Sequence, residues 1–228
     1  MPPATRPARP TLSRAAVVAE AVALADTEGI DAVSMRALAG RLGVVPMALY
    51  KHVADKEDLL DGMVDHVIGG FAPPAHASSA GEWKDAVRGR VLAARTAVAA
   101  HPWARRAIET RTRRTPTVLR HMDTLTGLLL AGGFTPDLAH HAMHALGNRI
   151  WGFSPELFND PGSTPAPRPS AAPDPDPADY PAIVAVAADA TARRPGGSCD
   201  EDFEFAFALD LVLDAVGRLS AAGWTSPR

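Results

Sequence analysis

The stretch SMRALAGRLGVVPMALYKHVADKEDLLDGMVD, residues 34–65, decides the fold of this 228-residue chain. Ser34 can cap a short helix and Gly43 can end it, because a hydroxyl accepts a helical N–H and glycine tolerates a left-handed conformation. Pro46 suits the first position of the next helix, where its missing N–H would have no partner. Asp55 can cap a longer helix with an apolar stripe. The stretch predicts two short helices around a tight turn and a third helix after them.

Two helices cross closely when the first presents a small residue, the turn accepts a left-handed residue, and the second returns an apolar side chain. Ala39, Gly43 and Leu49 meet these three needs at the spacing of a helix-turn-helix. The helix expected over Pro46–His52 would then lie in the major groove of DNA with its first residues near the base edges. This pattern alone is also met by a pair of amphipathic helices that does not bind DNA, so that alternative stays open.

The residues around this stretch extend the helical pattern in both directions. Residues 1–12 hold four prolines and two arginines and are expected to form a disordered basic arm. Ser13 can cap a first helix, and Gly29 can end it. The prediction is therefore a three-helix DNA-binding domain over residues 13–55, reached by a fourth helix that begins the next domain.

The remainder, residues 56–228, is predicted to be a helical ligand-binding and dimerisation domain. Beyond the fourth helix, we expect helices at about 82–100, 102–111, 116–132, 136–158, 179–193 and 201–222. Residues 161–178 hold seven prolines and are expected to be a mobile loop. No strand-like alternation competes with these helices, so the predicted fold class is all-α.

Charge and cysteine content narrow the class of protein further. Residues 1–56 carry seven Lys and Arg against five Asp and Glu, whereas the remainder carries 16 against 21. The basic balance therefore lies where a DNA-binding module needs it. One cysteine excludes an internal disulfide, and no signal peptide or spanning helix is evident. We expect a soluble cytoplasmic protein with no membrane association, no metal and no cofactor.

With these residues in view, the chain resembles the TetR family of bacterial repressors, close to its tetracycline-binding members. The resemblance is carried by residues 34–65 and, more loosely, by HPWARRAI (101–108), LLAGGFTPDLA (129–139) and FEFAFALDLVLDAVGRL (203–219). It implies contact with double-stranded operator DNA by Ser34, Arg36, Val45, Pro46, Met47, Ala48, Tyr50, Lys51, His52 and Lys56. The helix begins with apolar residues, so base contacts would depend on thymine methyl groups and the operator sequence cannot be transferred.

The tetracycline-binding members hold a magnesium–drug chelate through histidines, and the resemblance places Ala72 and Ile108 at those positions. Nearby His66 and His76 leave the alignment register open. The sequence therefore predicts an effector other than a tetracycline held in that way.

The final helix is apolar on most of its surface, with a narrow polar stripe at Asp210, Asp214 and Arg218. A helix with one face exposed to solvent would not need so wide an apolar surface. We therefore expect it to form a homodimer interface with the helix at 136–158, in a bundle of four helices. A central core helix of a monomer is the alternative.

A small-molecule effector is expected in a cavity among the helices of the larger domain, where apolar walls mix with a few polar groups. The candidate ligand-binding residues are Arg90, Ala94, Trp103, Ile108, Met122, Leu125, Leu129, His144, Asn148 and Trp151. His140, His141 and His144 could bind a metal at this spacing, but we favour a solvated or ligand-contacting pair because no acid or cysteine completes the set. The arginines from Arg105 to Arg114 suit a solvated loop, or an acidic effector.

These patterns together predict a ligand-responsive repressor that releases its operator when the effector binds. The alternative is a DNA-binding regulator without an effector, which would show no cavity open toward the fourth helix. An enzyme is disfavoured because the chain lacks the GxSxG, P-loop, HExxH and GxGxxG motifs, and Cys199 has no adjacent base in the sequence.

Overall fold

The computed structural model describes residues 12–71, 82–111, 113–151, 176–193 and 200–227. Within them every regular element is helical, which confirms the predicted fold class. The α-helices are α1 (Arg14–Glu28), α2 (Met35–Leu42), α3 (Pro46–Leu49), α4 (Lys56–Gly69), α5 (Trp83–Ala99), α6 (Ala104–Glu109), α7 (Pro116–Ala131), α8 (Pro136–Trp151), α9 (Pro181–Arg193) and α10 (Glu201–Ala221), with two 3-10 helices, η1 (Ile30–Ala32) and η2 (Pro177–Asp179). Most of the expected arm and of the expected proline-rich loop lies outside the described residues. None of the helices described here is both long and apolar enough to span a bilayer.

The ends of the first helices follow from local side-chain chemistry. The Ser13 hydroxyl accepts the Ala16 N–H at 3.2 Å at the start of α1. Gly29 ends that helix at φ +84°, a conformation that favours glycine. The Asp55 carboxylate accepts the Asp58 N–H at 2.8 Å at the start of α4. These ends are those predicted from the sequence.

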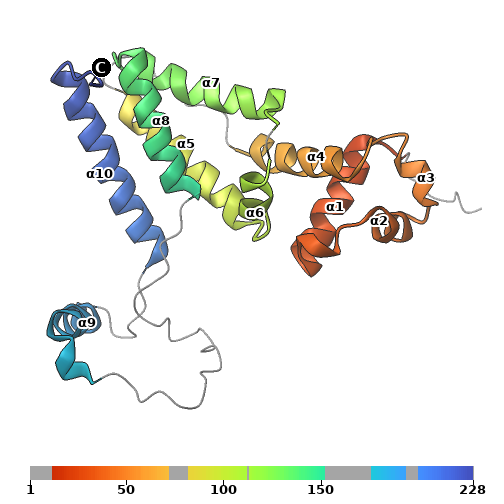
Figure 1. Ribbon diagram of the computed structural model, residues 1–228, viewed down its shortest axis with the longest axis horizontal. Coiled ribbons are helices and arrows are strands. Elements are labelled where there is room, and N and C mark those ends of the chain that lie inside the picture. The colour runs from red at the N-terminus through yellow and green to blue at the C-terminus, as the bar shows by residue number, and fades with distance from the viewer. Residues whose placement is uncertain (1–11, 72–81, 112, 152–175, 194–199, 228) are drawn as a thin grey trace, which may run out of the picture.

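Helices α1, α2 and α3 form a compact N-terminal module at one end of the molecule, and α4 runs from this module to the remaining helices (Figure 1). One apolar core joins α1, α2, α3 and α4 and reaches α6 through Ala104 and Ala107. A second core is built by α5, α7, α8 and α10. Since α4 also contacts α5, α6 and α7, it connects the N-terminal module to the larger helical part.

The polar stripe of α10 is paired with α5. Three carboxylates of α10 meet three cations of α5, and because the residue numbers run in opposite directions, the two helices are antiparallel. The pairs are Lys84 with Asp214, Arg88 Nε with Asp210 Oδ1 at 2.7 Å, and Arg95 Nη2 with Asp202 Oδ1 at 3.0 Å. Beside this stripe, Phe205, Leu209, Leu213 and Val216 are buried in the second core. The pairing fixes which side of α10 faces its own domain.

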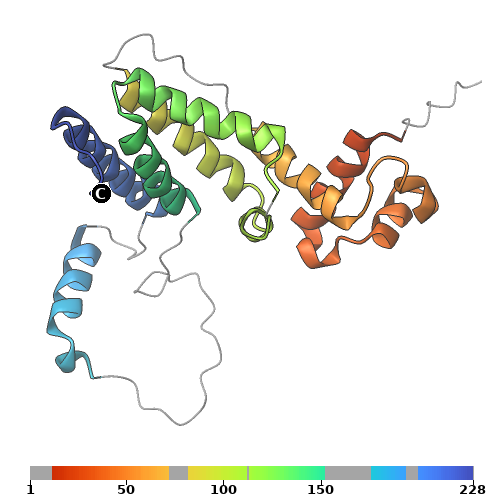
Figure 2. The ribbon, with the colours of Figure 1, turned by 45° about the horizontal axis from the view of Figure 1, so that its top comes forward.

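Helix α9 lies apart from the other helices in both views (Figures 1 and 2). Its apolar residues Ile183, Val184 and Val186 are exposed. The sequence predicted this helix within two residues of its observed ends.

Candidate nucleic-acid interface and ligand cavity

The turn between α2 and α3 has the geometry that the sequence predicted. Gly43 adopts φ +66° and ψ 36°, and the next N–H, of Val44, donates to the Ala39 carbonyl at 2.9 Å. Ala39 and Leu49 are buried against each other's helices in the first core. The small residue, the left-handed glycine and the returning leucine together set the crossing of α2 and α3.

Helix α3 is shorter than expected, since it ends at Leu49 rather than His52. The chain continues as a turn in which the N–H groups of His52 and Val53 both donate to the Leu49 carbonyl, at 2.8 and 3.0 Å. Val53 is buried in the core. The turn therefore keeps Val53 in the core, as Leu49 is, before α4 begins at Lys56.

The surface of α3 and its flanks carries the residues expected to contact DNA. Eight of the ten are exposed and two, Ala48 and His52, are half-buried. Val45 and Met47 are the most open apolar side chains of the group, at 68% and 71% exposure. Lys51, which follows α3, and Lys56, the first residue of α4, are exposed cations. Exposed apolar groups thus stand at the start of α3 and exposed cations follow its end, which suits groove contacts flanked by phosphate contacts.

An ion pair that the sequence did not predict holds this surface in place. Both guanidinium nitrogens of Arg14 donate to the Asp58 carboxylate, at 2.7 and 2.8 Å, and Arg14 also donates to the His52 carbonyl at 3.2 Å. Asp58 accepts the Ala54 N–H at 2.9 Å as well. The hydrogen bonds from Arg14 hold the pKa of Asp58 below its usual range. Because Arg14 and Asp58 are 44 residues apart, no local pattern could have revealed the pair.

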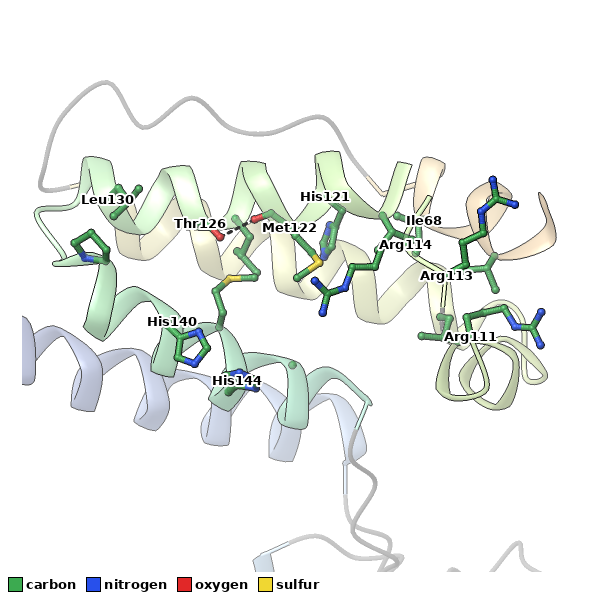
Figure 3. A pocket seen from close by; sticks show the side chains of 17 residues that line it. Ile68, Arg111, Arg113, Arg114, His121, Met122, Thr126, Leu130, His140 and His144 are labelled. Carbon is green, nitrogen blue, oxygen red and sulfur yellow. Dashed lines mark hydrogen bonds between the residues drawn. The ribbon is translucent and has the colours of Figure 1, made fainter. Parts of the chain in front are cut away.

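A cavity of about 610 Å³ lies in the larger helical part, bounded by α4, α6, α7, α8 and the loop before α7 (Figure 3). Its walls mix apolar side chains, such as Val64, Ile68 and Val118, with cationic and imidazole groups. This size and lining are typical of a pocket for a drug-sized ligand. Since α4 supplies part of the wall, the cavity touches the helix that carries the N-terminal module.

The expected ligand-binding residues divide between the cavity and its surroundings. Ile108, Met122, Leu125 and His144 line the cavity. Ala94 and Trp103 are packed in the first core and Leu129 in the second. Arg90 lies behind the wall, where its Nη2 atom is 3.2 Å from His121 Nδ1. Asn148 and Trp151 belong to the end of α8, where the structure does not describe the side chains.

Several further lining residues were not among the ten candidate ligand-binding residues. They are Val64, Ile68, Arg111, Arg113, Arg114, Val118, His121, Thr126, Leu130, Pro136, His140, Met143 and Gly147. Part of this set had a detectable signal, because Val118, Met122 and Thr126 follow an i, i+4 spacing on α7 and Pro136, His140 and His144 do so on α8. The three arginines belong to the run that suited a solvated loop or an acidic effector, and a loop has no periodicity that marks which of them face the cavity.

The environment of His121 fixes its chemical state. Burial, together with the positive charge of Arg90, lowers the pKa of His121 to about 4, so the ring is neutral near pH 7. A guanidinium can only donate, so Nδ1 accepts from Arg90 and the proton resides on Nε2. His121 therefore offers one N–H donor to its surroundings.

The histidines of α8 form a group of rings in edge-to-face contact. The rings of His140 and His144, which line the cavity, have centroids 4.7 Å apart, and His141 lies 5.5 Å from the Trp224 ring. Among the residues that the structure describes, no group of three His, Cys, Asp or Glu side chains could hold a metal ion. The geometry of His140 and His144 suits contact with a ligand in the cavity.

Polar contacts tie the segment around α6 to the N-terminal module. One oxygen of Asp26, in α1, accepts from Trp103 Nε1 at 2.6 Å and lies 2.8 Å from His101 Nδ1. Arg106 of α6 donates to Asp31 of η1 at 3.0 Å. A displacement of α6 at the cavity would therefore act on α1 and η1 directly.

Comparison with protein families finds two matches along the chain. Residues 17–63 match the family of bacterial regulatory proteins of the tetR family, and residues 74–218 match the tetracyclin repressor-like C-terminal domain. The second match spans more than half of the chain.

Individual proteins give the same result. The chain is 34% identical over 126 residues to an HTH-type transcriptional regulator of Saccharopolyspora erythraea, covering 55% of this chain and 52% of that protein. It is 33% identical over 135 residues to the HTH-type transcriptional repressor DrrR1 of Streptomyces coeruleorubidus, covering 59% and 50%. The chain thus spans about half the length of these curated relatives. The TetR family protein ActR of Streptomyces coelicolor, solved in complex with (S)-DNPA, superposes with a TM-score of 0.69 at 26% identity, covering 92% of this chain and 98% of that one.

Proposed function

Because this chain belongs to the TetR family of bacterial regulatory proteins, we propose that it is a transcriptional repressor that binds operator DNA and releases it when a small molecule occupies the cavity. The observation that carries the proposal is the surface formed by α3 and its flanking residues. The side chains of Val45, Met47 and Tyr50 are exposed there, and so are those of Lys51 and Lys56. A small module rarely exposes several large apolar side chains unless a binding partner covers them. A repressor must reach chromosomal DNA, so the proposal includes a cytoplasmic location.

The cavity supports a ligand-responsive regulator over one without an effector. A regulator without an effector has no use for a space of about 610 Å³ against the helix that carries its DNA-binding module. The relative ActR was solved in complex with (S)-DNPA, which indicates that a similar fold can hold a bound molecule. We infer that Val64 and Ile68 are the residues of α4 that sense an occupant.

The proposed switch is a population shift between two orientations of the N-terminal module. An occupant that displaces α6 against α4 would pull on Asp26 and Asp31 through Trp103 and Arg106. The two modules of a dimer would then no longer match the spacing of successive major grooves. A coupling of about 1–3 kcal/mol between the two sites is the usual size for such a response.

Homodimerisation is part of the proposal, and the outer face of α10 supports it. Phe203, Phe207 and Leu211 follow an i, i+4 spacing, and each is more than half exposed. The inner face of the same helix is already committed to the second core. A second copy would cover the outer stripe and place two α3 helices about one DNA turn apart.

The DNA-binding part is tested with duplexes selected from a random pool by the purified protein. Lys56→Ala should weaken binding of the selected duplex several-fold and reduce the salt dependence by about one phosphate contact. Tyr50→Phe should cost about fivefold, the usual value of one hydrogen bond. Lys84→Ala and Tyr180→Phe are matched controls, because Lys84 pairs with Asp214 on α10 and Tyr180 follows η2, away from the N-terminal module.

If no duplex is enriched over bulk competitor at low ionic strength, the repressor proposal is wrong. If a duplex is enriched and the two controls weaken its binding as much as the two α3 variants do, DNA binding stands but this surface is not the interface.

The dimer is tested separately by replacing Phe207 and Leu211 together with aspartate. Both side chains point outward, so the helical content should persist while sedimentation equilibrium shows a monomer. Operator affinity should fall sharply because two linked modules bind far more tightly than one. A variant that stays dimeric would place the interface elsewhere.

A further inference from the structure

The cavity has an unbalanced charge. The described residues that line it include three arginines and three histidines and no carboxylate. Its apolar walls come from α4, α7 and α8, while the arginines cluster at one end, in the segment between α6 and α7. An apolar chamber with cations at one end is complementary to a molecule with an apolar body and one anionic group.

The three arginines differ in their availability. Arg111 is 86% buried by its side chain and donates to Glu57 Oε2 at 2.6 Å, with Asp61 Oδ1 at 3.6 Å, so its charge is already balanced. Arg113 adds to the field at Asp58. Arg114 is exposed, and no ion pair joins it to a carboxylate in the part of the chain that the structure describes.

The three arginines also differ in the direction of their side chains. Figure 3 shows the Arg114 side chain turned toward the middle of the cavity, while those of Arg111 and Arg113 point away from it. A guanidinium presents two parallel N–H groups that match the two oxygens of a carboxylate or sulfonate. Arg114 is therefore the cation in position to receive an acid group from inside the cavity.

His121 supplies a second donor on the same wall. With Nδ1 engaged by Arg90, its Nε2–H remains available to an oxygen of the occupant. Thr126 does not add a donor in this state, because its hydroxyl donates to the Met122 carbonyl at 2.8 Å. The polar groups of the wall thus favour an acceptor-rich, negatively charged group.

Resting on the function proposed above, we propose that the effector is an amphipathic organic anion, with its carboxylate or sulfonate on Arg114 and its apolar body between α4, α7 and α8. Two contacts make this position effective for regulation. Arg111 fixes the loop to α4 through Glu57, and the Thr115 hydroxyl, one residue after Arg114, donates to Asp65 of α4. An anion held by Arg114 therefore acts on a loop that is anchored to α4 on both sides.

The test uses two fluorescent probes that share one ring system and differ by a sulfonate. They are 1-anilinonaphthalene-8-sulfonate, which is anionic, and N-phenyl-1-naphthylamine, which is neutral. Arg114→Gln should weaken the anionic probe about tenfold, as expected for a charge-assisted hydrogen-bonded pair, and leave the neutral probe within about twofold. Arg105→Gln is the matched control, because Arg105 pairs with Glu109 on α6 and does not line the cavity.

Met143→Trp serves as the second variant, since it fills the cavity from α8. It should remove binding of both probes. The proposal is overturned if Arg114→Gln weakens both probes equally, if it weakens neither, or if Met143→Trp leaves the anionic probe bound.

The outcome is separable from that of the repressor proposal. Arg114→Gln without a probe should bind the selected duplex as wild type does, because Arg114 is not on the α3 surface. Probe results that fail while the duplex still binds reject only the effector class. Failure to enrich any duplex rejects the repressor, whatever the probes show.

Discussion

The ion pair between Arg14 and Asp58 allows a sharp prediction about the N-terminal module. Asp58→Asn keeps the size of the side chain and one acceptor for the Ala54 N–H, but it removes the charge that meets both guanidinium nitrogens at 2.7 and 2.8 Å. The side chains of Arg14 and Asp58 are 46% and 25% exposed, so solvent screening reduces the pair to about 1 kcal/mol. Loss of a negative charge from the first turn of α4 adds about 0.5 kcal/mol. We expect a total loss of about 1.5 kcal/mol near pH 7.

The same ion pair also predicts how the loss of unfolding free energy in Asp58→Asn depends on pH. The pKa of Asp58 is lower in the folded protein than in the unfolded chain, so the pair contributes fully above the ordinary aspartate range. That contribution is lost as the pH falls through the lowered pKa. The difference in unfolding free energy between wild type and Asp58→Asn should therefore be constant from about pH 7 to about pH 5 and shrink below about pH 4.

The assay is urea unfolding followed by circular dichroism, at one fixed protein concentration because a dimer would shift the midpoint. Glu109→Gln is the matched control, since it breaks an exposed pair with Arg105 and should cost less than about 0.5 kcal/mol. A loss below about 0.5 kcal/mol for Asp58→Asn, or a difference that does not change down to about pH 3, would refute the reasoning.

Three further predictions concern packing and titration. Gly132→Ala should destabilise by about 1–3 kcal/mol because its Cβ would lie 2.6 Å from Trp83 Cγ, whereas Gly127→Ala, on the same helix with open space, should stabilise by up to about 1 kcal/mol; thermal unfolding of the pair tests both. Leu38→Ala should cost about 3 kcal/mol in urea unfolding, since the side chain is fully buried in the first core. His121→Gln should remove a loss of about 2 kcal/mol that wild type shows between about pH 6.5 and about pH 4.5, because burial lowers the pKa of His121 to about 4 and protonation favours the unfolded chain.

The elements near the N-terminus could be predicted because their signals are local. Ser13, Gly29, Gly43 and Asp55 act within four residues of the helix ends they define. The exposed surface of α3 was predictable for the same reason, since Leu49 alone fixes which side of the short helix faces the core.

The length of α3 and the lining of the cavity were harder to predict. The end of α3 at Leu49 has no local signal, because Tyr50, Lys51 and His52 include no proline, glycine or capping residue that would stop a helix there. The residues expected at the cavity were chosen as apolar or polar groups on predicted helices, but a helix of the larger domain has two buried sides. Ala94 and Leu129 are packed in a core, Met122 lines the cavity, and Leu125 does both, and composition does not distinguish these cases.

Capping, proline placement and apolar periodicity act over a few residues, so the amino-acid sequence was enough to predict the helices, the capped ends of α1, α2 and α4, and the turn at Gly43. Three relations become visible only in the folded molecule: Arg14 meets Asp58, α10 is paired through its carboxylates with α5, and Arg114 turns into the cavity. The physical reason is that these relations join residues from separate elements. Their partners are chosen by how the cores pack together, and no stretch of the chain carries that information alone.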